Sequence, residues 1–320
     1  MSFANDLVHR FYYKLGYSYR YNKFRKIFKP DVKAEYAGKK LLTGRQGNDL
    51  IAKQLESNEP FLAARLGSVE LGLIYNYYLY NGKNVEWDKG CVNNMQRNAG
   101  FFPTGNEYLI RYCEEMLKHI EQVDLMGVWY NEGEEEICQR YCKPDATFCD
   151  LVGIEPFYYP ENPWSKQLAG KKVLVIHPFD ESINYQYKNN RERIFAGQPD
   201  MLPEFELKTI RAVQSIGGDG HGFKTWFEAY ESMCKQMQQI DFDVVIIGAG
   251  AYGMPLGSFA KQMGKQAIHM GGASQLLFGI LGKRWADRSD INIYFNQYWK
   301  RPYPQETPDT AQAVENACYW

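Results

Sequence analysis

The chain has 320 residues, with 37 Lys and Arg against 38 Asp and Glu and a formal net charge of -1. This length allows one large domain or two closely associated halves with a sizeable core. The balanced charge excludes a whole-molecule field that attracts nucleic acid, so we expect no nucleic-acid partner. The 7 cysteines lack paired CxxC spacing, which excludes a disulfide framework and a zinc ribbon and indicates reduced thiols.

Residues 1–40 are predicted to form a basic, aromatic N-terminal arm, and residues 41–320 a single α/β domain. Residues 1–30 combine aromatic side chains with Lys and Arg and contain almost no acids. Two interpretations stay open: contact with an anionic membrane surface, or a helix packed on the body; such arms also form contacts between copies of a chain. No apolar run is long enough to span a bilayer. We therefore expect a cytoplasmic protein. It could contact the inner face of the cell membrane, and it could form a homo-oligomer.

The first half of the domain, about residues 41–160, alternates helices and strands. The pattern predicts a helix that ends near residue 58, a strand over 61–64 and a helix from about residue 68. A turn and a helix follow within 93–122, then a strand over 123–129. The acidic run 132–136 is interpreted as the solvated start of another helix. Residues 156–172, rich in proline and aromatics, are expected to connect the two halves.

The second half, about residues 165–290, has a cleaner alternation, and a C-terminal tail follows it. Strands are predicted over 172–179, 207–216, 241–250 and 265–272, and helices within 181–205, 225–240 and 254–264. Strands that alternate with helices predict a mostly parallel sheet flanked by helices. The fold class is therefore α/β with a Rossmann-like architecture.

Three glycines after the strand of residues 244–247 have the spacing GxGxxG. Gly248, Gly250 and Gly253 open a helix, where they would let a phosphate approach the backbone and the helix N-terminus. A dinucleotide site also needs a carboxylate at the end of the next strand, but His269 stands there. We therefore expect neither NAD nor FAD. An NAD- or FAD-dependent oxidoreductase and a turn that only packs helix on strand stay as alternatives.

A second motif, RxGxxE, lies where the strand of residues 61–64 runs into a helix. Arg65 offers a fork of donors suited to phosphate or carboxylate, and Gly67 allows close backbone approach. Glu70 falls in the first helical turn, where the helix dipole favours its ionised form. It could act as a general base or hold a divalent metal against a diphosphate. The alternative is a capping glutamate that pairs with Arg65.

Four segments together carry a resemblance to a known family. They are RLGSVE (65–70), NAGFFP (98–103), VLVIHPF (173–179) and the long run from VVIIGAG to GKRW (244–285). From about residue 44 to 290 the chain resembles bacterial glycosyltransferases of the GT-D type. It is most similar to the RxGxxE branch, found among polysaccharide-biosynthesis cluster proteins.

The resemblance implies transfer of a sugar from a nucleotide-diphosphate donor, most often a UDP-sugar, to a glycan or lipid-linked glycan acceptor in bacterial surface polysaccharide synthesis. Glu70 matches the second carboxylate of the family's Asp-x-Glu element, which is implicated in metal and donor binding, and Ser68 replaces the first. One carboxylate holds Mn²⁺ or Mg²⁺ poorly unless diphosphate oxygens complete the shell. Arg65 or the pair Lys283–Arg284 is the alternative charge for the leaving diphosphate. Because of Ser68, a non-catalytic nucleotide- or glycan-binding partner also stays open.

The catalytic candidates are thus Arg65 and Glu70, with Glu70 also the metal candidate. Candidate donor-binding residues lie at strand ends and turns. They are Gly67, Ser68, Asn98, His177, Gly248, Gly250, Gly253, His269, Gly271, Gly272, Gln275, Lys283 and Arg284. Residues 271–275 are expected to form a second helix-start anion site. Each candidate has a structural alternative: a loop turn, a satisfied strand-end histidine or a solvated helix end.

Overall fold

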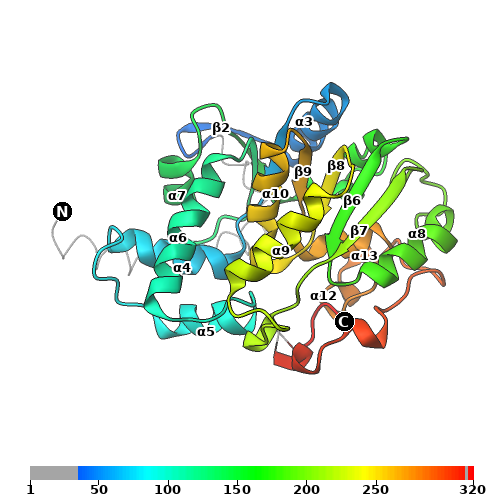
Figure 1. Cartoon of the computed structure of the whole chain (residues 1–320). Coiled ribbons are helices and arrows are strands. Elements are labelled where there is room, and N and C mark those ends of the chain that lie inside the picture. Colours follow the sequence, from blue (N-terminus) through cyan, green and yellow to red (C-terminus); the bar gives the residue numbers. More distant parts are fainter. Residues whose placement is uncertain (1–34, 314–315) are drawn as a thin grey trace.

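A computed structural model gives the structure of the protein and describes residues 35–313 and 316–320 (Figure 1). The predicted arm falls largely in residues 1–34, outside the described residues. Residues 35–42 instead form the first two strands of the sheet, which the sequence did not predict. Within the described ranges, no helix has the length and apolar character needed to cross a membrane.

One nine-stranded sheet forms the centre of the molecule, in the order β1-β2-β5-β4-β3-β9-β8-β6-β7. Its strands are β1 (Glu35–Tyr36), β2 (Lys39–Leu42), β3 (Phe61–Ala64), β4 (Leu125–Val128), β5 (Thr147–Asp150), β6 (Lys172–His177), β7 (Glu206–Arg211), β8 (Val244–Ile247) and β9 (Gln266–His269). The β1–β2 pair is antiparallel and all other pairs are parallel. The predicted α/β class with a mostly parallel sheet is confirmed.

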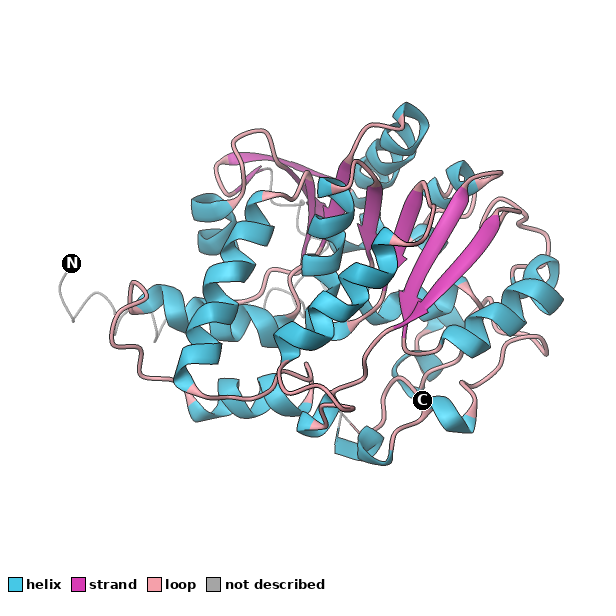
Figure 2. Cartoon of the chain, viewed as in Figure 1, coloured by secondary structure: helices cyan, strands magenta, loops and turns pink. Residues whose placement is uncertain are grey.

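Helices flank the sheet (Figures 1 and 2). They are α3 (Gly44–Ser57), α4 (Ser68–Leu79), α5 (Lys89–Arg97), α6 (Asn106–Glu121), α7 (Glu134–Tyr141), α8 (Asp180–Ile194), α9 (Trp226–Gln238), α10 (Gly253–Gln262), α11 (Ser274–Leu277), α12 (Lys283–Ala286) and α13 (Ser289–Asn292). Capping hydrogen bonds fix the start of some of these helices. At α3 the Thr43 hydroxyl accepts from the Gln46 amide at 3.2 Å, and the Gln46 side chain accepts from the Thr43 amide at 3.0 Å.

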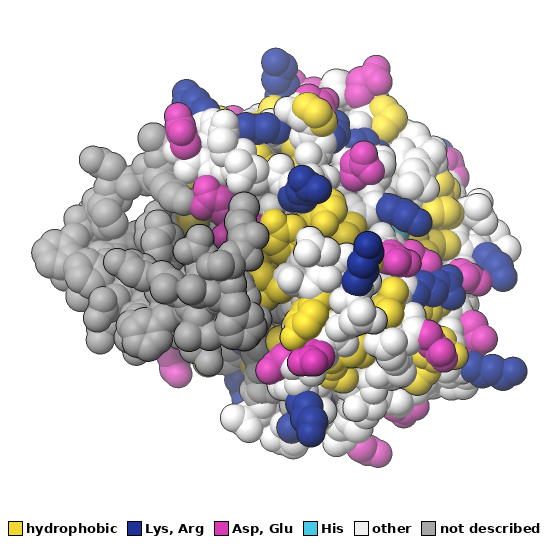
Figure 3. Space-filling view, turned by 90° about the vertical axis from the view of Figure 1, so that its left-hand side faces the viewer, with side chains coloured by type: hydrophobic (Ala, Val, Ile, Leu, Met, Phe, Trp, Pro, Cys, Tyr) yellow, Lys and Arg dark blue, Asp and Glu magenta, His cyan; other side chains and the backbone are white. Residues whose placement is uncertain are grey.

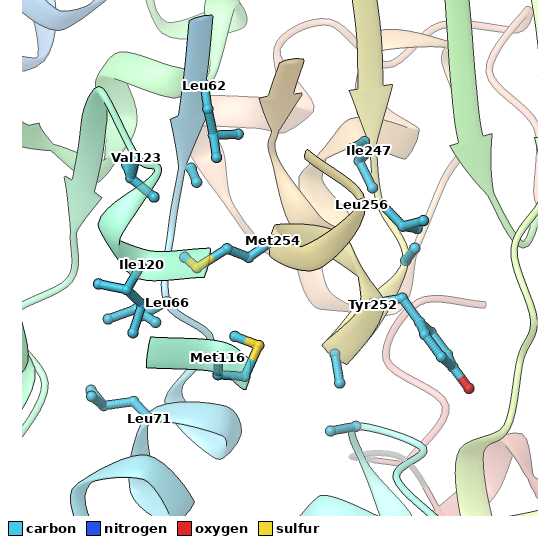
Figure 4. Packing of buried hydrophobic residues seen from close by; sticks show 14 of the residues in the cluster. Leu62, Leu66, Leu71, Met116, Ile120, Val123, Ile247, Tyr252, Met254 and Leu256 are labelled. Atoms are coloured by element: carbon cyan, nitrogen blue, oxygen red, sulfur yellow. The ribbon is translucent and has the colours of Figure 1, made fainter. Parts of the chain in front are cut away.

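Alternate residues of the strands point into two apolar layers, as the period of two in a strand requires. Leu62 and Ile247 belong to the layer that also holds side chains of α4, α6, α9 and α10. Figure 4 shows Met254 and Leu256 of α10 packed in that layer. The neighbouring residues of the same strands enter the second layer, with side chains of α3 and α8. Both faces of the central strands are therefore buried, which is typical of parallel sheets.

The predicted connector packs against the second apolar layer. Trp164, within residues 156–172, is fully buried, and its Nε1 donates to the Ile154 carbonyl at 2.9 Å. Its amide donates to Asn48 of α3 at 2.9 Å. The segment is thus fixed to the first helix of the domain. On the face in Figure 3, basic and acidic side chains are interspersed, in keeping with the near-zero net charge.

Candidate functional site

A cavity of about 180 Å³ lies at the carboxyl ends of β3, β9, β8 and β6. In open parallel sheets, ligands bind in the crevice beyond these strand ends. Most residues singled out from the sequence line it: Arg65, Gly67, Ser68, Glu70, Asn98, His177, Gly248, Gly250, His269, Gly271, Gly272, Gln275 and Arg284. Gly253 and Lys283 do not line it. The structure thus brings the two motifs to one place, and the roles of these residues stay predictions.

Arg65 directly follows β3 and is half-buried at the cavity. Its guanidinium carbon lies 3.6 Å from the centre of the Trp129 ring. Gly271, at a φ of +63°, is also near Arg65: an added Cβ there would come within 3.4 Å of Arg65 Nη1. Burial lowers the pKa of Arg65, and the charges of Glu155 and Glu70 oppose that shift. In residues 35–313 and 316–320 no group accepts a hydrogen bond from this guanidinium.

Glu70 is the third residue of α4, whose N-cap is Gly67. Its carboxylate folds back over Gly67, so that a Cβ there would lie 2.0 Å from Oε2. Burial raises the pKa of Glu70, while its own backbone amide and the charge of Arg65 lower it. Within the part of the chain described, Arg65 and Glu70 form no ion pair, so the salt bridge of the alternative interpretation is absent. The Glu70 carboxylate does lie against the start of α4, as a capping glutamate would.

Two neutral histidines line the same cavity. The amide of Phe179 donates to Nδ1 of His177 at 3.0 Å, so the ring proton lies on Nε2. Burial lowers the pKa of His177 to about 3. Burial lowers the pKa of His269 to about 3, and the charge of Arg65 contributes to the same shift. Neither ring is charged near neutral pH, and His177 can donate to a ligand oxygen.

The three glycines of GxGxxG have different surroundings. Gly250 is exposed at a φ of +52°, and the atom nearest to an added Cβ would be the Ala99 carbonyl oxygen at 3.6 Å. At Gly248 a Cβ would come within 2.6 Å of the His177 ring, and at Gly253 within 2.2 Å of His269 Nε2. The expectation that all three face a phosphate is therefore wrong for Gly253. That glycine makes room for the His269 ring.

Gly253→Ala is expected to destabilise the protein by about 1–3 kcal/mol, because the new methyl group overlaps the buried His269 ring. The matched control is Gly72→Ala within α4, where the nearest atom is the Cys91 sulfur at an ordinary 3.5 Å. That change should be neutral or raise the free energy of unfolding by about 0.5–1 kcal/mol. Urea denaturation measures both, and equal effects would contradict this packing role.

The second predicted anion site does not form as expected. Helix α11 has 4 residues, too short to develop a helix terminus that attracts anions. Instead, Gly272 lies against the Tyr319 ring, where a Cβ would come within 2.2 Å of Cε1. Gln275 Nε2 donates to the Tyr319 carbonyl at 3.1 Å, and Arg284 Nη1 donates to the Tyr319 hydroxyl at 2.9 Å. Lys283 is exposed outside the cavity. Of the predicted basic pair, only Arg284 reaches the site.

Sequence reasoning missed the aromatic residues that line the cavity, which are Trp129, Phe179, Tyr252, Tyr319 and Trp320. Tyr319 and Trp320 return to the cavity from the far end of the sequence. Trp320 packs edge-on against Phe179, with ring centres 5.8 Å apart. No spacing rule marks these residues, because their place depends on contacts between segments far apart in the chain.

Trp129 follows β4 and is held by a turn that Glu134 organises. The Glu134 carboxylate accepts from the amides of Trp129, Tyr130 and Asn131, at 3.0, 2.7 and 3.2 Å. Tyr130 has a φ of 62°, strained for a bulky residue, and its hydroxyl donates to Asp150 at 2.5 Å. The interpretation of residues 132–136 as a solvated helix start is therefore wrong at Glu134, which is fully buried.

Glu134→Gln is expected to change how stability depends on pH. Burial raises the pKa of Glu134 to about 7, against hydrogen bonds from the turn that lower it. The folded state therefore holds this proton more tightly than the unfolded state, and the resulting stability is lost as the pH rises through 7. From pH 5 to pH 8 the free energy of unfolding of the variant should rise by about 2–3 kcal/mol relative to that of the wild type. A difference in unfolding free energy that does not vary with pH would contradict this.

The donors around the cavity do not form a resident metal site. Glu70 is the only carboxylate among the described residues that line it. The described part of the chain holds no group of three His, Cys, Asp or Glu residues arranged for a metal ion. Mn²⁺ and Mg²⁺ prefer several oxygen ligands, and two arginines line the same wall. A cation that arrives with a diphosphate stays a prediction.

Comparison with known proteins gives a weak likeness only. No protein-family model and no curated protein matches the chain. Two solved structures of domain of unknown function 1792 match it, each over 83% of this chain and 92% of the other, with a TM-score of 0.43. One is a selenomethionine-substituted structure at 13% identity; the other, at 14%, is described as having a distinct glycosyltransferase fold. Similarity this low carries no conclusion about the activity of this chain.

Proposed function

We propose that the protein is a glycosyltransferase that takes a sugar from a nucleotide-diphosphate donor. One observation carries the proposal: the guanidinium of Arg65, whose donors no described residue uses, and the carboxylate of Glu70 line the same cavity at the strand ends. A fork of unused donors in a partly buried site fits a phosphate or carboxylate ligand. A carboxylate beside it adds the means to move a proton.

The residues divide into two chemical roles. Arg65 and Arg284 place positive charge where a diphosphate would leave, and the Nε2 proton of neutral His177 adds a donor. Burial raises the pKa of Glu70, which suits a group that accepts a proton near neutral pH. In the proposed reaction the acceptor oxygen bonds to the anomeric carbon as the bond from that carbon to the diphosphate oxygen breaks. The acceptor's hydroxyl proton passes to Glu70.

The finer parts of the proposal rest on the sequence resemblance. A UDP-sugar donor, a glycan or lipid-linked glycan acceptor and a role in bacterial surface polysaccharide synthesis follow from the four family-like segments. The cavity itself supports an anionic ligand with a hydrogen-bonding, uncharged part. We keep the cytoplasmic face of the membrane as the proposed location on the same basis.

A thermal-shift panel tests the proposal. The ligands are UDP-, GDP-, TDP- and CMP-sugars, NAD and FAD, each with and without Mn²⁺. A true ligand at 100 times its dissociation constant should stabilise the protein by about 2.7 kcal/mol, and we expect a diphosphate sugar to give the largest rise in Tm. A shift with NAD or FAD alone would favour an oxidoreductase. A shift with a sugar nucleotide but no transfer or hydrolysis would favour a non-catalytic binding partner.

A further inference from the structure

The Trp129 ring covers one face of the Arg65 guanidinium, with the guanidinium carbon 3.6 Å from the ring centre. Gly271 stands near the guanidinium and has no side chain to contact it; an added Cβ there would lie 3.4 Å from Nη1. The five donors of a guanidinium lie in its plane. Since Trp129 covers one face, the donors in the plane are the part of Arg65 that a ligand in the cavity can bind.

The backbone at Trp129 is fixed by several independent contacts. Glu134 accepts hydrogen bonds from three successive amides, those of residues 129–131. Tyr130 is held in the left-handed region, and its hydroxyl bonds to buried Asp150. Strain of this kind persists only where the surroundings over-determine it, and it gathers at functional sites. The turn therefore holds the backbone from which the Trp129 ring extends over Arg65.

We propose that Trp129 is a positioning residue for Arg65. Its ring face keeps the guanidinium edge-on to the cavity, so that two parallel N–H groups take two oxygens of one phosphate group. The inference rests on the proposed function only in taking a diphosphate as the natural ligand. Trp129, which belongs to neither motif, would thus fix the geometry of phosphate recognition.

The ring face, and not the indole nitrogen, is the part that matters. Trp129 Nε1 is buried and has no hydrogen-bond partner among the described residues. A phenyl ring presents a similar face to a cation. Phe at this position should therefore still position the Arg65 guanidinium. Leu, which has no ring, should not.

Binding of inorganic pyrophosphate to the full chain, measured by calorimetry, tests this. Trp129→Phe should keep the Kd within about threefold, and Trp129→Leu should weaken binding about tenfold. The control is Trp87→Leu, because Trp87 stacks on Tyr77 outside the cavity, with ring centres 6.5 Å apart. That variant should bind as the wild type does. Wild-type affinity in Trp129→Leu would overturn the inference.

A double-mutant cycle separates positioning from general loosening of the site. If Trp129 acts through Arg65, Trp129→Leu should cause no further loss in an Arg65→Lys background. An equal loss in both backgrounds would also overturn the inference. Should the Leu variant fail to fold, NMR of the wild type decides: the Arg65 Nε–H signal, assigned by its loss in Arg65→Lys, must show a ring-current shift. Pyrophosphate binding without turnover of any sugar nucleotide would defeat the proposed function and leave this inference standing.

Discussion

Glu70→Gln should reduce sugar transfer by at least about a hundredfold and leave the fold intact. The amide keeps the size of the side chain at the start of α4 but cannot accept a proton. Glu70 is the only carboxylate side chain among the described lining residues, so no other lining side chain can accept the proton as a carboxylate. Initial rates of nucleoside diphosphate release, with Tm as the check on folding, measure the effect.

The chain offers a matched control for this change. Glu228 also occupies the third position of a helix, α9, and accepts from the Lys224 amide at 2.8 Å, but it lies outside the cavity. Glu228→Gln should therefore reproduce any general effect of a lost helix-start charge, worth about 0.3–1 kcal/mol of stability, without loss of turnover. Near wild-type turnover by Glu70→Gln would remove Glu70 from the mechanism.

Arg65→Ala should lower kcat by about 10²–10³-fold, comparable to the loss of one preorganised donor in an oxyanion site. The substitution removes the guanidinium that stacks on Trp129 at the cavity. Arg65→Lys should recover only part of the loss, because an ammonium group cannot form two parallel bonds to one phosphate. Steady-state kinetics with a saturating donor measure the change.

Arg111 supplies the control for this second prediction. It also stacks on an aromatic ring, 3.8 Å from the centre of Phe227, and it pairs with Glu115 at 2.8 Å, but it is exposed and outside the cavity. Arg111→Ala should leave kcat within about twofold, since exposed ion pairs contribute little. An equal loss of activity in the two variants would mean that the effect of Arg65→Ala is structural.

The strand ends could be predicted from the sequence because local patterns determine them. A β-branched run such as residues 244–247 and a following glycine turn place the next side chains at the sheet edge. Arg65, Glu70 and His177 were found in this way: Arg65 follows β3, Glu70 lies in the first turn of the next helix, and His177 ends β6. Position along the chain was thus enough to bring the motifs together, since the carboxyl ends of parallel strands share one edge.

Other features depend on contacts that no local pattern records. Strands β2 and β5 have four residues each, and they pair across a long stretch of sequence, with Leu41 opposite Phe148. Glu134 belongs to an acidic run, and only the fold shows that its carboxylate is buried against the turn of Trp129. The spacing of GxGxxG likewise does not show that Gly253 serves a histidine ring. A motif predicts where a residue lies more reliably than what it faces.

Release of nucleoside diphosphate from sugar nucleotides by the wild-type protein tests the central claim most directly. With UDP-, GDP- and TDP-sugars as substrates, we expect the protein to hydrolyse or transfer at least one of them. Glu70→Gln should abolish that release, and Glu228→Gln should retain it. If the wild type and Glu70→Gln release nucleoside diphosphate at the same rate, or if neither releases any from a donor that binds, the proposal of a glycosyltransferase that depends on Glu70 is contradicted.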